Sequence, residues 1–177
     1  FQARQAIIKE DRCFLVEGYT DVLSMHESGV ENVVASSGTA LTQEQIRLIK
    51  RFTPNITMLY DGDPAGIKAS LRGTDMVLEE GMNVRIVVLP DGEDPDSYSK
   101  KVSDEEFKKY LKENETDFIR FKTKILLDEA QSDPVRRANL VREVVRSIAV
   151  IPDQITRTVY VKECSTQLSM PEEVVLD

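Results

Sequence analysis

The sequence is poor in the residues that bind zinc. It contains one histidine, His26, and two cysteines, Cys13 and Cys164, which lie far apart and have no CxxC companion. These three residues cannot form a zinc site, and so few cysteines indicate a reducing compartment. Long apolar runs are also absent: no stretch approaches the roughly 20 residues that cross a bilayer, and nothing resembles a signal peptide. These absences predict a cytoplasmic protein.

Composition and charge set further bounds. The 177 residues are enough for one good core or two small ones, and 41% hydrophobic with 31% charged residues is ordinary for a globular protein. The net charge of −8 is uneven, because residues 1–115 carry 14 Lys/Arg against 21 Asp/Glu, whereas residues 116–177 carry 9 against 10. Such a chain is not an obvious nucleic-acid binder unless its carboxylates gather metal. Since it begins at Phe1 without methionine, we expect a fragment of a longer protein.

Short apolar runs alternate with helical patterns in the first half of the chain. The runs are rich in β-branched residues, as in strands buried on both faces, and lie at 13–18, 31–36, 55–61 and 83–90. Helical patterns lie at 20–29, 42–52 and 64–81, and a further one begins at Ser103. This alternation predicts βαβ units and a parallel sheet.

The pattern changes after about residue 115. Residues 116–130, 133–151 and 153–168 have helical spacing without strands between them. We therefore predict an α/β fold, with a parallel sheet flanked by helices over 1–115, followed by an all-helical subdomain over 116–177.

Acidic residues follow three of the predicted strands. Glu17 closes the first strand, with Asp21 in the next helical turn; Asp61 and Asp63 close the third; the loop 91–96 follows the fourth. Carboxyl ends of parallel strands meet at one sheet edge, where ligands bind. Two carboxylates about 4 Å apart repel by about 4 kcal/mol at an effective dielectric near 20. A divalent cation would reverse that sign, and an all-oxygen donor set favours Mg²⁺ or Mn²⁺ and suits phosphoryl or nucleotidyl transfer.

Each acid also has an ordinary structural interpretation. Asp63 precedes Pro64 and could cap a helix, and Asp21 is favoured by the dipole of its helix. The loop 91–96 could be an exposed turn. Glu17 is harder to explain, because a half-buried acid at a strand end needs a partner. The three ordinary explanations would have to coincide at one edge, which favours the metal site.

Four motifs carry a resemblance to a known family. They are VEGYTDVL (16–23), SSGTALT (36–42), LYDGDPAGIKAS (59–70) and LPDGEDPDSY (89–98). A glutamate after the first strand and a DxD after the third resemble the TOPRIM module. GTALT and LPDGEDPD resemble, more specifically, the TOPRIM part of the RNA polymerase domain in bacterial DNA primases. The resemblance is strong over 12–100, and 151–168 is similar to the end of that polymerase domain.

The resemblance implies a set of site residues and partners. The metal positions would be Glu17, Asp21, Asp61, Asp63, Asp94 and Asp96, of which Glu17, Asp61 and Asp63 would be catalytic. It implies a nucleotidyltransferase that uses Mg²⁺ or Mn²⁺ to join NTPs into an RNA primer on a single-stranded DNA template. It also implies a replicative helicase as partner, through a domain absent from this chain, and zinc only in another absent domain. Whether the chain is active without those parts is left open.

Three other interpretations stay open. A TOPRIM nuclease or topoisomerase would share the fold, although nothing here marks the nucleophilic tyrosine of a topoisomerase. A haloacid-dehalogenase-like phosphatase also ends a strand in DxD, but on its first strand rather than its third. A non-catalytic interaction module is the third. Primer synthesis as against phosphate-ester hydrolysis separates these classes.

Overall fold

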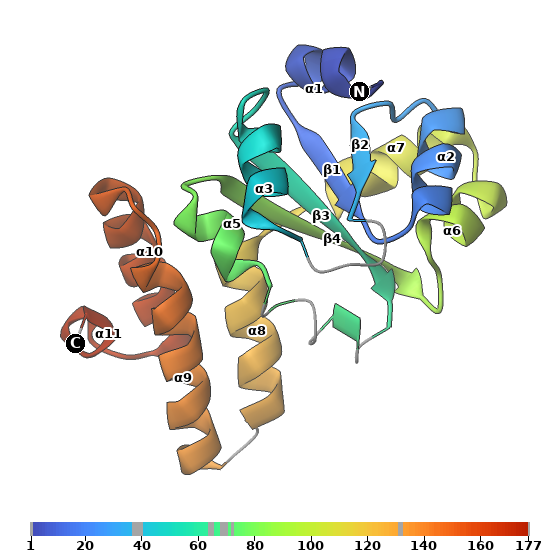
Figure 1. The fold of residues 1–177 in the computed structure, drawn as a ribbon. Helices are drawn as coiled ribbons and strands as arrows, with labels where there is room; N and C mark the ends of the chain where they lie inside the picture. Colours follow the sequence, from blue (N-terminus) through green and yellow to red (C-terminus); the bar gives the residue numbers. More distant parts are fainter. Residues whose placement is uncertain are drawn as a thin grey trace.

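The computed structural model describes residues 2–36, 41–63, 66–67, 71, 73–130 and 133–176. Within them lies a five-stranded sheet of order β2-β1-β3-β4-β5 (Figure 1). The strands are β1 (Cys13–Val16), β2 (Val33–Ala35), β3 (Asn55–Gly62), β4 (Asn83–Asp91) and β5 (Thr116–Asp117). The first four pair in parallel, as predicted, whereas β5 runs antiparallel to β4. This short edge strand falls in a segment that the sequence predicted to be helical.

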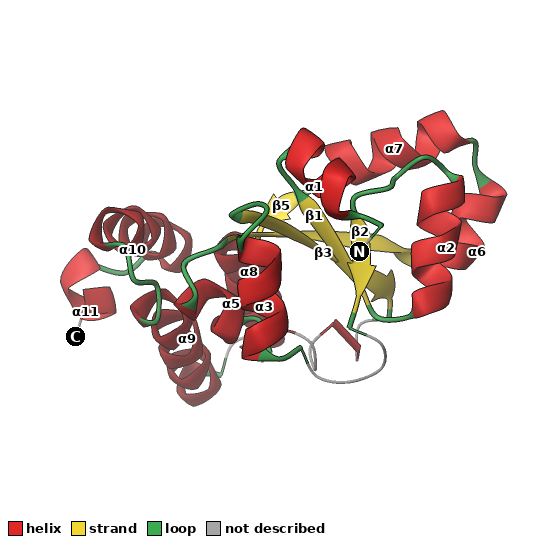
Figure 2. Ribbon diagram, turned by 45° about the horizontal axis from the view of Figure 1, so that its top comes forward, coloured by secondary structure: helices red, strands yellow, loops and turns green. Residues whose placement is uncertain are grey.

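Helices cover both faces of the sheet, and the later helices extend as a bundle beside it (Figure 2). One face carries α2 (Tyr19–Glu27), α6 (Pro95–Lys101) and α7 (Asp104–Glu113); the other carries α3 (Gln43–Lys50), α5 (Asp75–Glu79) and α8 (Phe118–Ala130). α1 (Arg4–Glu10) lies near the start of β1, and α9 (Pro134–Ala149), α10 (Gln154–Leu168) and α11 (Glu172–Leu176) complete the bundle α8–α11. The predicted fold class is confirmed.

Side chains of β3 alternate between two apolar clusters, because successive residues of a strand point to opposite faces. Met58 and Tyr60 pack in the cluster that contains Phe118 of α8, whereas Leu59 packs in the cluster that contains Phe107 of α7. The alternation decides which way the acids at the end of β3 face. Residue 61 shares a face with Leu59, toward α2 and α6.

Local signals in the sequence explain most helix ends. Thr42 caps α3 and Ser103 caps α7, each in a reciprocal pair with the residue three positions on. Gly29 and Gly81 have φ of +76° and +74°, the left-handed conformation expected after a helix. Other elements were not foreseen, among them α1, α6 and α11. Of the predicted helix over 64–81, residues 66–67 and 71 and α5 are helical, with a turn at 73–74 before α5; residues 64–65, 68–70 and 72 lie outside the described part.

One core connects the sheet to the bundle. Met58 of β3, Phe118 of α8 and Val144 of α9 belong to the same buried cluster. Because this core includes residues on both sides of residue 115, it does not test the predicted division there, which stays a prediction. In the part of the chain that the structure describes, no helix is both long enough and apolar enough to cross a membrane.

Candidate active site

Acidic side chains reach one edge of the sheet from three strand ends. Glu17 immediately follows β1, Asp61 is the last residue but one of β3, and Asp94 lies in the loop after β4. The connection from β1 to β2 passes over one face in α2, and the connection from β2 to β3 over the other face in α3 (Figures 1 and 2). Open α/β sheets bind ligands where the connections change side in this way. Glu17 and Asp61 flank that point.

The end of β3 is shaped by a bulge. The register between β3 and β4 shifts between Tyr60 and Gly62, so Asp61 lies at the irregularity. A Cβ atom on Gly62 would lie 2.0 Å from the carbonyl oxygen of Pro90, so only glycine permits this approach of the two strands. Bulges beside active sites re-aim side chains. The glycine between the two aspartates of the DxD is therefore a steric requirement of the strand end.

Asp21 lies in the first turn of α2. Its Oδ2 accepts a hydrogen bond of 3.0 Å from the N–H of Gly18, the N-cap residue of α2. Partial burial raises the pKa of Asp21, the Gly18 hydrogen bond lowers it, and the charges of Asp94, Asp96 and Glu17 raise it further. The structural explanation for Asp21 is thus present, and so is its proximity to the other acids.

Asp63 also plays a structural part. Its Oδ2 accepts a hydrogen bond of 3.1 Å from the N–H of Gly66, and its carbonyl oxygen accepts one of 3.0 Å from Ile67. These are the contacts of a helix N-cap, the alternative that the sequence left open. A carboxylate has two oxygens, so a capping bond to Oδ2 does not prevent Asp63 from also binding a cation.

Asp94 caps α6 through a hydrogen bond of 2.6 Å from the N–H of Ser97. Asp96 accepts hydrogen bonds from Lys100 Nζ, at 2.7 Å, and from the hydroxyl of Ser24 on α2. Lys100 first and Ser24 second lower the pKa of Asp96. The Ser24–Asp96 contact thus joins α6 to α2, and both Asp94 and Asp96 already have hydrogen-bond donors.

Two of these partners were missed by sequence reasoning. Ser97 could have been found, because it stands three residues after Asp94 with a proline at the first helical position, a helix-start pattern. Ser24 gave no signal, since its contact with Asp96 spans 72 residues.

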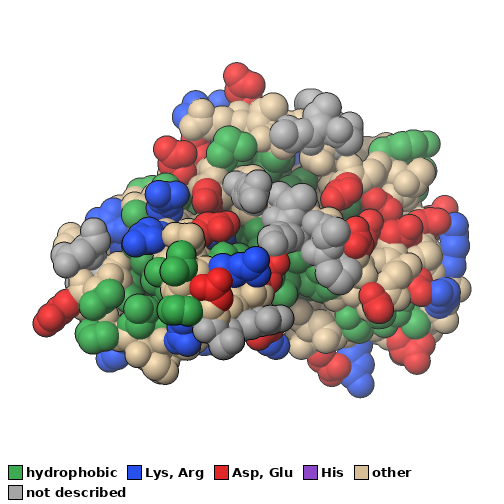
Figure 3. Space-filling view, turned by 90° about the horizontal axis from the view of Figure 1, so that it is seen from below, with side chains coloured by type: hydrophobic (Ala, Val, Ile, Leu, Met, Phe, Trp, Pro, Cys, Tyr) green, Lys and Arg blue, Asp and Glu red, His purple; other side chains and the backbone are tan. Residues whose placement is uncertain are grey.

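Asp61 carries the clearest electrostatic signature of the site. Its pKa is raised to about 6, first by partial loss of water and then by the charges of Glu17, Asp21, Asp94 and Asp63. The structure therefore brings predicted carboxylates from three strand ends close enough to repel one another. Figure 3 views this side of the molecule, where acidic side chains gather on the half away from the bundle.

The donor set fits a hard divalent cation in its chemistry. Every predicted ligand is a carboxylate, which suits Mg²⁺ or Mn²⁺. Glu17 and Asp61 accept no hydrogen bond from the residues that the structure describes. Among these residues no group of three acidic, histidine or cysteine side chains is arranged closely enough to hold a metal ion. The carboxylates must therefore converge further to bind one, and the predicted site residues stay predictions.

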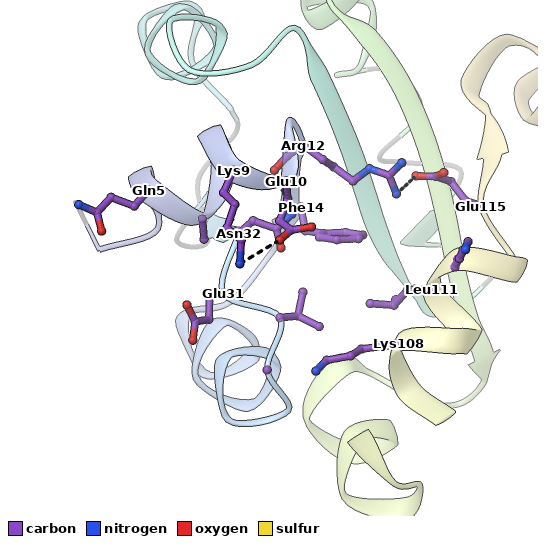
Figure 4. A pocket seen from close by; sticks show the side chains of 14 residues that line it. Gln5, Lys9, Glu10, Arg12, Phe14, Glu31, Asn32, Lys108, Leu111 and Glu115 are labelled. Atoms are coloured by element: carbon purple, nitrogen blue, oxygen red, sulfur yellow. Dashed lines mark hydrogen bonds and ion pairs between the residues drawn. The ribbon is translucent and has the colours of Figure 1, made fainter. Parts of the chain in front are cut away.

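A concave region lies at the opposite edge of the sheet. A groove of about 980 Å³ runs between α1, the end of α2 and α7, and none of the site carboxylates lines it (Figure 4). Arg12 and Glu115 pair across it at 3.0 Å, and the side-chain amide of Asn32 donates to the Arg12 carbonyl oxygen at 3.0 Å. The groove faces the amino ends of the parallel strands, away from the edge where ligands of such sheets bind.

Comparison with protein families matches both parts of the chain. Residues 14–99 match a Toprim-like family model, and residues 121–173 match the DnaB-helicase binding domain of primase. The second match differs from the prediction that a helicase-binding domain lies outside this chain.

Comparison with individual proteins also finds DNA primases. The DNA primase of Staphylococcus epidermidis is 33% identical over 174 residues, which are 98% of this chain and 29% of that protein. A crystal structure of a DNA primase domain from Pseudomonas aeruginosa superposes with a TM-score of 0.85 at 30% identity, over 98% of this chain and 56% of that one. A DnaG primase catalytic domain bound to single-stranded DNA superposes with a TM-score of 0.79 at 31% identity, over 93% of this chain and 54% of that one. Such coverage includes most of 121–173, so these helices resemble part of a catalytic domain.

Proposed function

The chain belongs to the bacterial DNA primase family, and from that membership we propose that it is the metal-binding part of an RNA polymerase that makes primers on single-stranded DNA. The chain spans 29% of the length of its Staphylococcus epidermidis relative. The activity is therefore proposed for the whole protein of which this chain is a part.

The convergence of carboxylates at one sheet edge carries the proposal. Glu17, Asp61 and Asp94 come from three strand ends, and their repulsion contributes to a pKa of about 6 at Asp61. A folded chain keeps such a cluster at a cost in stability, which a bound divalent cation would offset. Since the donors are oxygens alone, Mg²⁺ or Mn²⁺ is the cofactor that we propose.

In this proposal a primer 3′-hydroxyl attacks the α-phosphorus of an NTP, and pyrophosphate leaves. The bound ion would stabilise charge on the attacking and leaving oxygens. Glu17 and Asp61, whose carboxylates have no hydrogen-bond donor among the described residues, would bind it directly. Asp63 and Asp21 would contribute from positions fixed by backbone N–H groups. Asp94 and Asp96 would close the site from the start of α6, which Ser24 joins to α2.

The partners follow from the relatives. The DnaG catalytic domain bound to single-stranded DNA supports such a template. NTPs as substrates and an RNA primer as product are part of the same proposal. The match of 121–173 to a DnaB-helicase binding domain supports a replicative helicase as a partner of the whole protein. A primase acts where the chromosome is copied, so we place this one in the cytoplasm. No zinc site is proposed within this chain, because the resemblance implies zinc only in another domain.

A primer-synthesis assay tests the function. The full-length parent protein is incubated with a single-stranded template, labelled NTPs and Mg²⁺, and the products are resolved by length. We expect short RNA, none of it in the presence of chelator, and none from Asp61→Asn. Asp104→Asn, an exposed aspartate on α7, is the matched control and should retain activity. Hydrolysis of the template without RNA synthesis would favour a TOPRIM nuclease instead.

A further inference from the structure

A buried lysine lies where the bundle meets the sheet. The side chain of Lys122, on α8, is 1% exposed, and its Nζ donates to the Ser147 hydroxyl of α9 at 2.8 Å. Carboxylate oxygens of Asp75, on α5, and Glu143, on α9, lie 3.7 and 3.6 Å away. A buried ammonium is costly unless it is paired and hydrogen-bonded. These oxygens therefore fix how α5 and α9 sit against α8.

The polar contacts continue from this lysine toward the candidate site. Ser147, which is fully buried, donates to Asp75 Oδ1 at 2.6 Å. Thr74, the residue before Asp75, is also buried, and its hydroxyl lies 3.3 Å from the hydroxyl of Tyr60. Tyr60 directly precedes Asp61 on β3. A polar line thus runs from the bundle to Asp75, passes along the backbone from Asp75 to Thr74, and reaches the end of the strand that carries the DxD; Figures 1 and 2 show α5 beside α8.

The geometry of β3 makes this line relevant to Asp61. Tyr60 and Asp61 are consecutive, so their side chains point to opposite faces of the same strand. A contact that holds the Tyr60 hydroxyl beside Thr74 therefore also constrains the backbone that bears Asp61, and with it the direction of the Asp61 side chain. The bulge lies at this point and interrupts the regular ladder between Tyr60 and Gly62. Side-chain anchors consequently contribute more to the orientation of this strand end than they would within a regular ladder.

We propose that Ser147 and Lys122 of the bundle are positioning residues for Asp61, acting through Asp75, Thr74 and Tyr60. In this proposal the bundle completes the core and also orients the Asp61 carboxylate on the opposite face of the sheet. The consequence for metal binding rests on the proposed function, whereas the mechanical coupling does not.

Hydrogen exchange separates positioning from simple stabilisation. A purely structural role predicts a general loss of stability, whereas positioning predicts local loosening at the end of β3. The probe is the Gly62 amide, which donates to the Glu93 carbonyl oxygen at 2.9 Å. The variants are Ser147→Ala, which removes the central hydroxyl, and Tyr60→Phe, which removes one hydroxyl with little change of volume.

Thr123→Val is the matched control. Its hydroxyl is also buried on α8, but it donates to the Ile119 carbonyl oxygen of the same helix and to no member of the polar line. We expect Ser147→Ala and Tyr60→Phe to accelerate exchange at Gly62 by about threefold to tenfold, the effect of one lost hydrogen bond, with no change in the control. Exchange at Gly62 that is equal in all three variants would overturn the proposal. If Ser147→Ala does not fold, Tyr60→Phe carries the test.

Manganese titration tests the consequence at the metal. Binding of Mn²⁺ is followed by electron paramagnetic resonance in the wild type and the same variants. We expect Ser147→Ala and Tyr60→Phe to weaken binding about threefold or more, and Thr123→Val to leave it unchanged. If the wild type binds no Mn²⁺, the proposed metal function fails, and exchange at Gly62 alone decides the positioning proposal. Wild-type affinity in Ser147→Ala and Tyr60→Phe would show that the line does not aim Asp61.

Discussion

Asp61, near the end of β3, has a pKa of about 6, raised first by loss of water and next by the charge of Glu17 at the end of the neighbouring strand β1. The two residues are separated by more than forty positions in sequence, and the parallel pairing of β1 with β3 brings them together. An ordinary aspartate ionises near pH 4. Without a cation, the ionised site therefore opposes folding at neutral pH.

This pKa predicts a pH dependence of stability. Between about pH 4 and pH 6 the folded state holds a proton on Asp61 that the unfolded state has released. The contribution of Asp61 to stability is thus complete below about pH 4 and is lost as the pH rises through about 6. In chelator, the Tm of the wild type minus the Tm of Asp61→Asn should therefore fall as the pH rises from about 4 to about 6. Parallel curves would show that Asp61 titrates normally.

Divalent metal should reverse the repulsion. We expect Mg²⁺ or Mn²⁺ to raise the Tm of the chain at pH 7, since an ion that binds only the folded state stabilises it by about 2.7 kcal/mol at a hundred times Kd. Asp61→Asn should be at least as stable as wild type without metal and should respond less to it. A thermal-shift titration measures both, with Ca²⁺-free buffers and Asp104→Asn as control. A wild type that does not respond to either ion contradicts the cation site.

Asp63 allows the capping and metal roles to be separated. Its Oδ2 accepts the Gly66 N–H at 3.1 Å, and asparagine can accept the same bond. Asp63→Asn should therefore keep the metal-free Tm and reduce the metal response, whereas Asp63→Ala should also destabilise the chain by about 1 kcal/mol. Denaturant unfolding with and without Mn²⁺ gives both quantities. If Asp63→Asn responds to metal as the wild type does, Asp63 is a cap alone.

Glu17 is the predicted catalytic residue with the fewest structural duties. It follows β1, and its side chain is exposed, which corrects the expectation of a half-buried acid; its carboxylate accepts no hydrogen bond from the described residues. Glu17→Gln keeps the shape and removes the charge that a metal or a proton transfer needs. In the full-length parent we expect primer synthesis to disappear while the fold and Tm are retained. Glu31→Gln, exposed before β2 at the opposite edge, should be fully active. Normal primer yield from folded Glu17→Gln eliminates a catalytic role.

Periodicity predicted the parts of the fold that follow from local chemistry. The apolar runs became β1, β2, β3 and β4; β3 is largely buried on both faces, whereas β4 begins with exposed and buried residues in alternation. Thr42 and Ser103 cap helices as their spacing indicated. The edge strand β5 could not be predicted, since it has only two residues, and these pair with Arg85 and Ile86 of β4, which are distant in sequence.

The candidate site was predictable in its residues but not in its supports. Acids at strand ends can be read from a sequence once the strands are known. The contact of Ser24 with Asp96 and that of Ser147 with Asp75 each join residues 72 positions apart. Such contacts arise from the packing of helices, which no local pattern encodes.

The charge distribution makes a last prediction about nucleic acid. Of the net charge of −8, most lies in the sheet-bearing part of the chain, and carboxylates crowd the edge where a template would approach. Affinity for DNA depends mainly on counterions released by Lys and Arg, and in residues 1–115 these number 14 against 21 Asp and Glu. Fluorescence anisotropy of a labelled single strand with this chain, at physiological salt and in chelator, should give a Kd no tighter than roughly 10⁻⁶ M, within the non-specific range. Mg²⁺ should strengthen binding in the wild type and not in Asp61→Asn, because the ion adds positive charge only where its ligands are intact. Nanomolar binding in chelator would mean that the chain has a basic template track of its own.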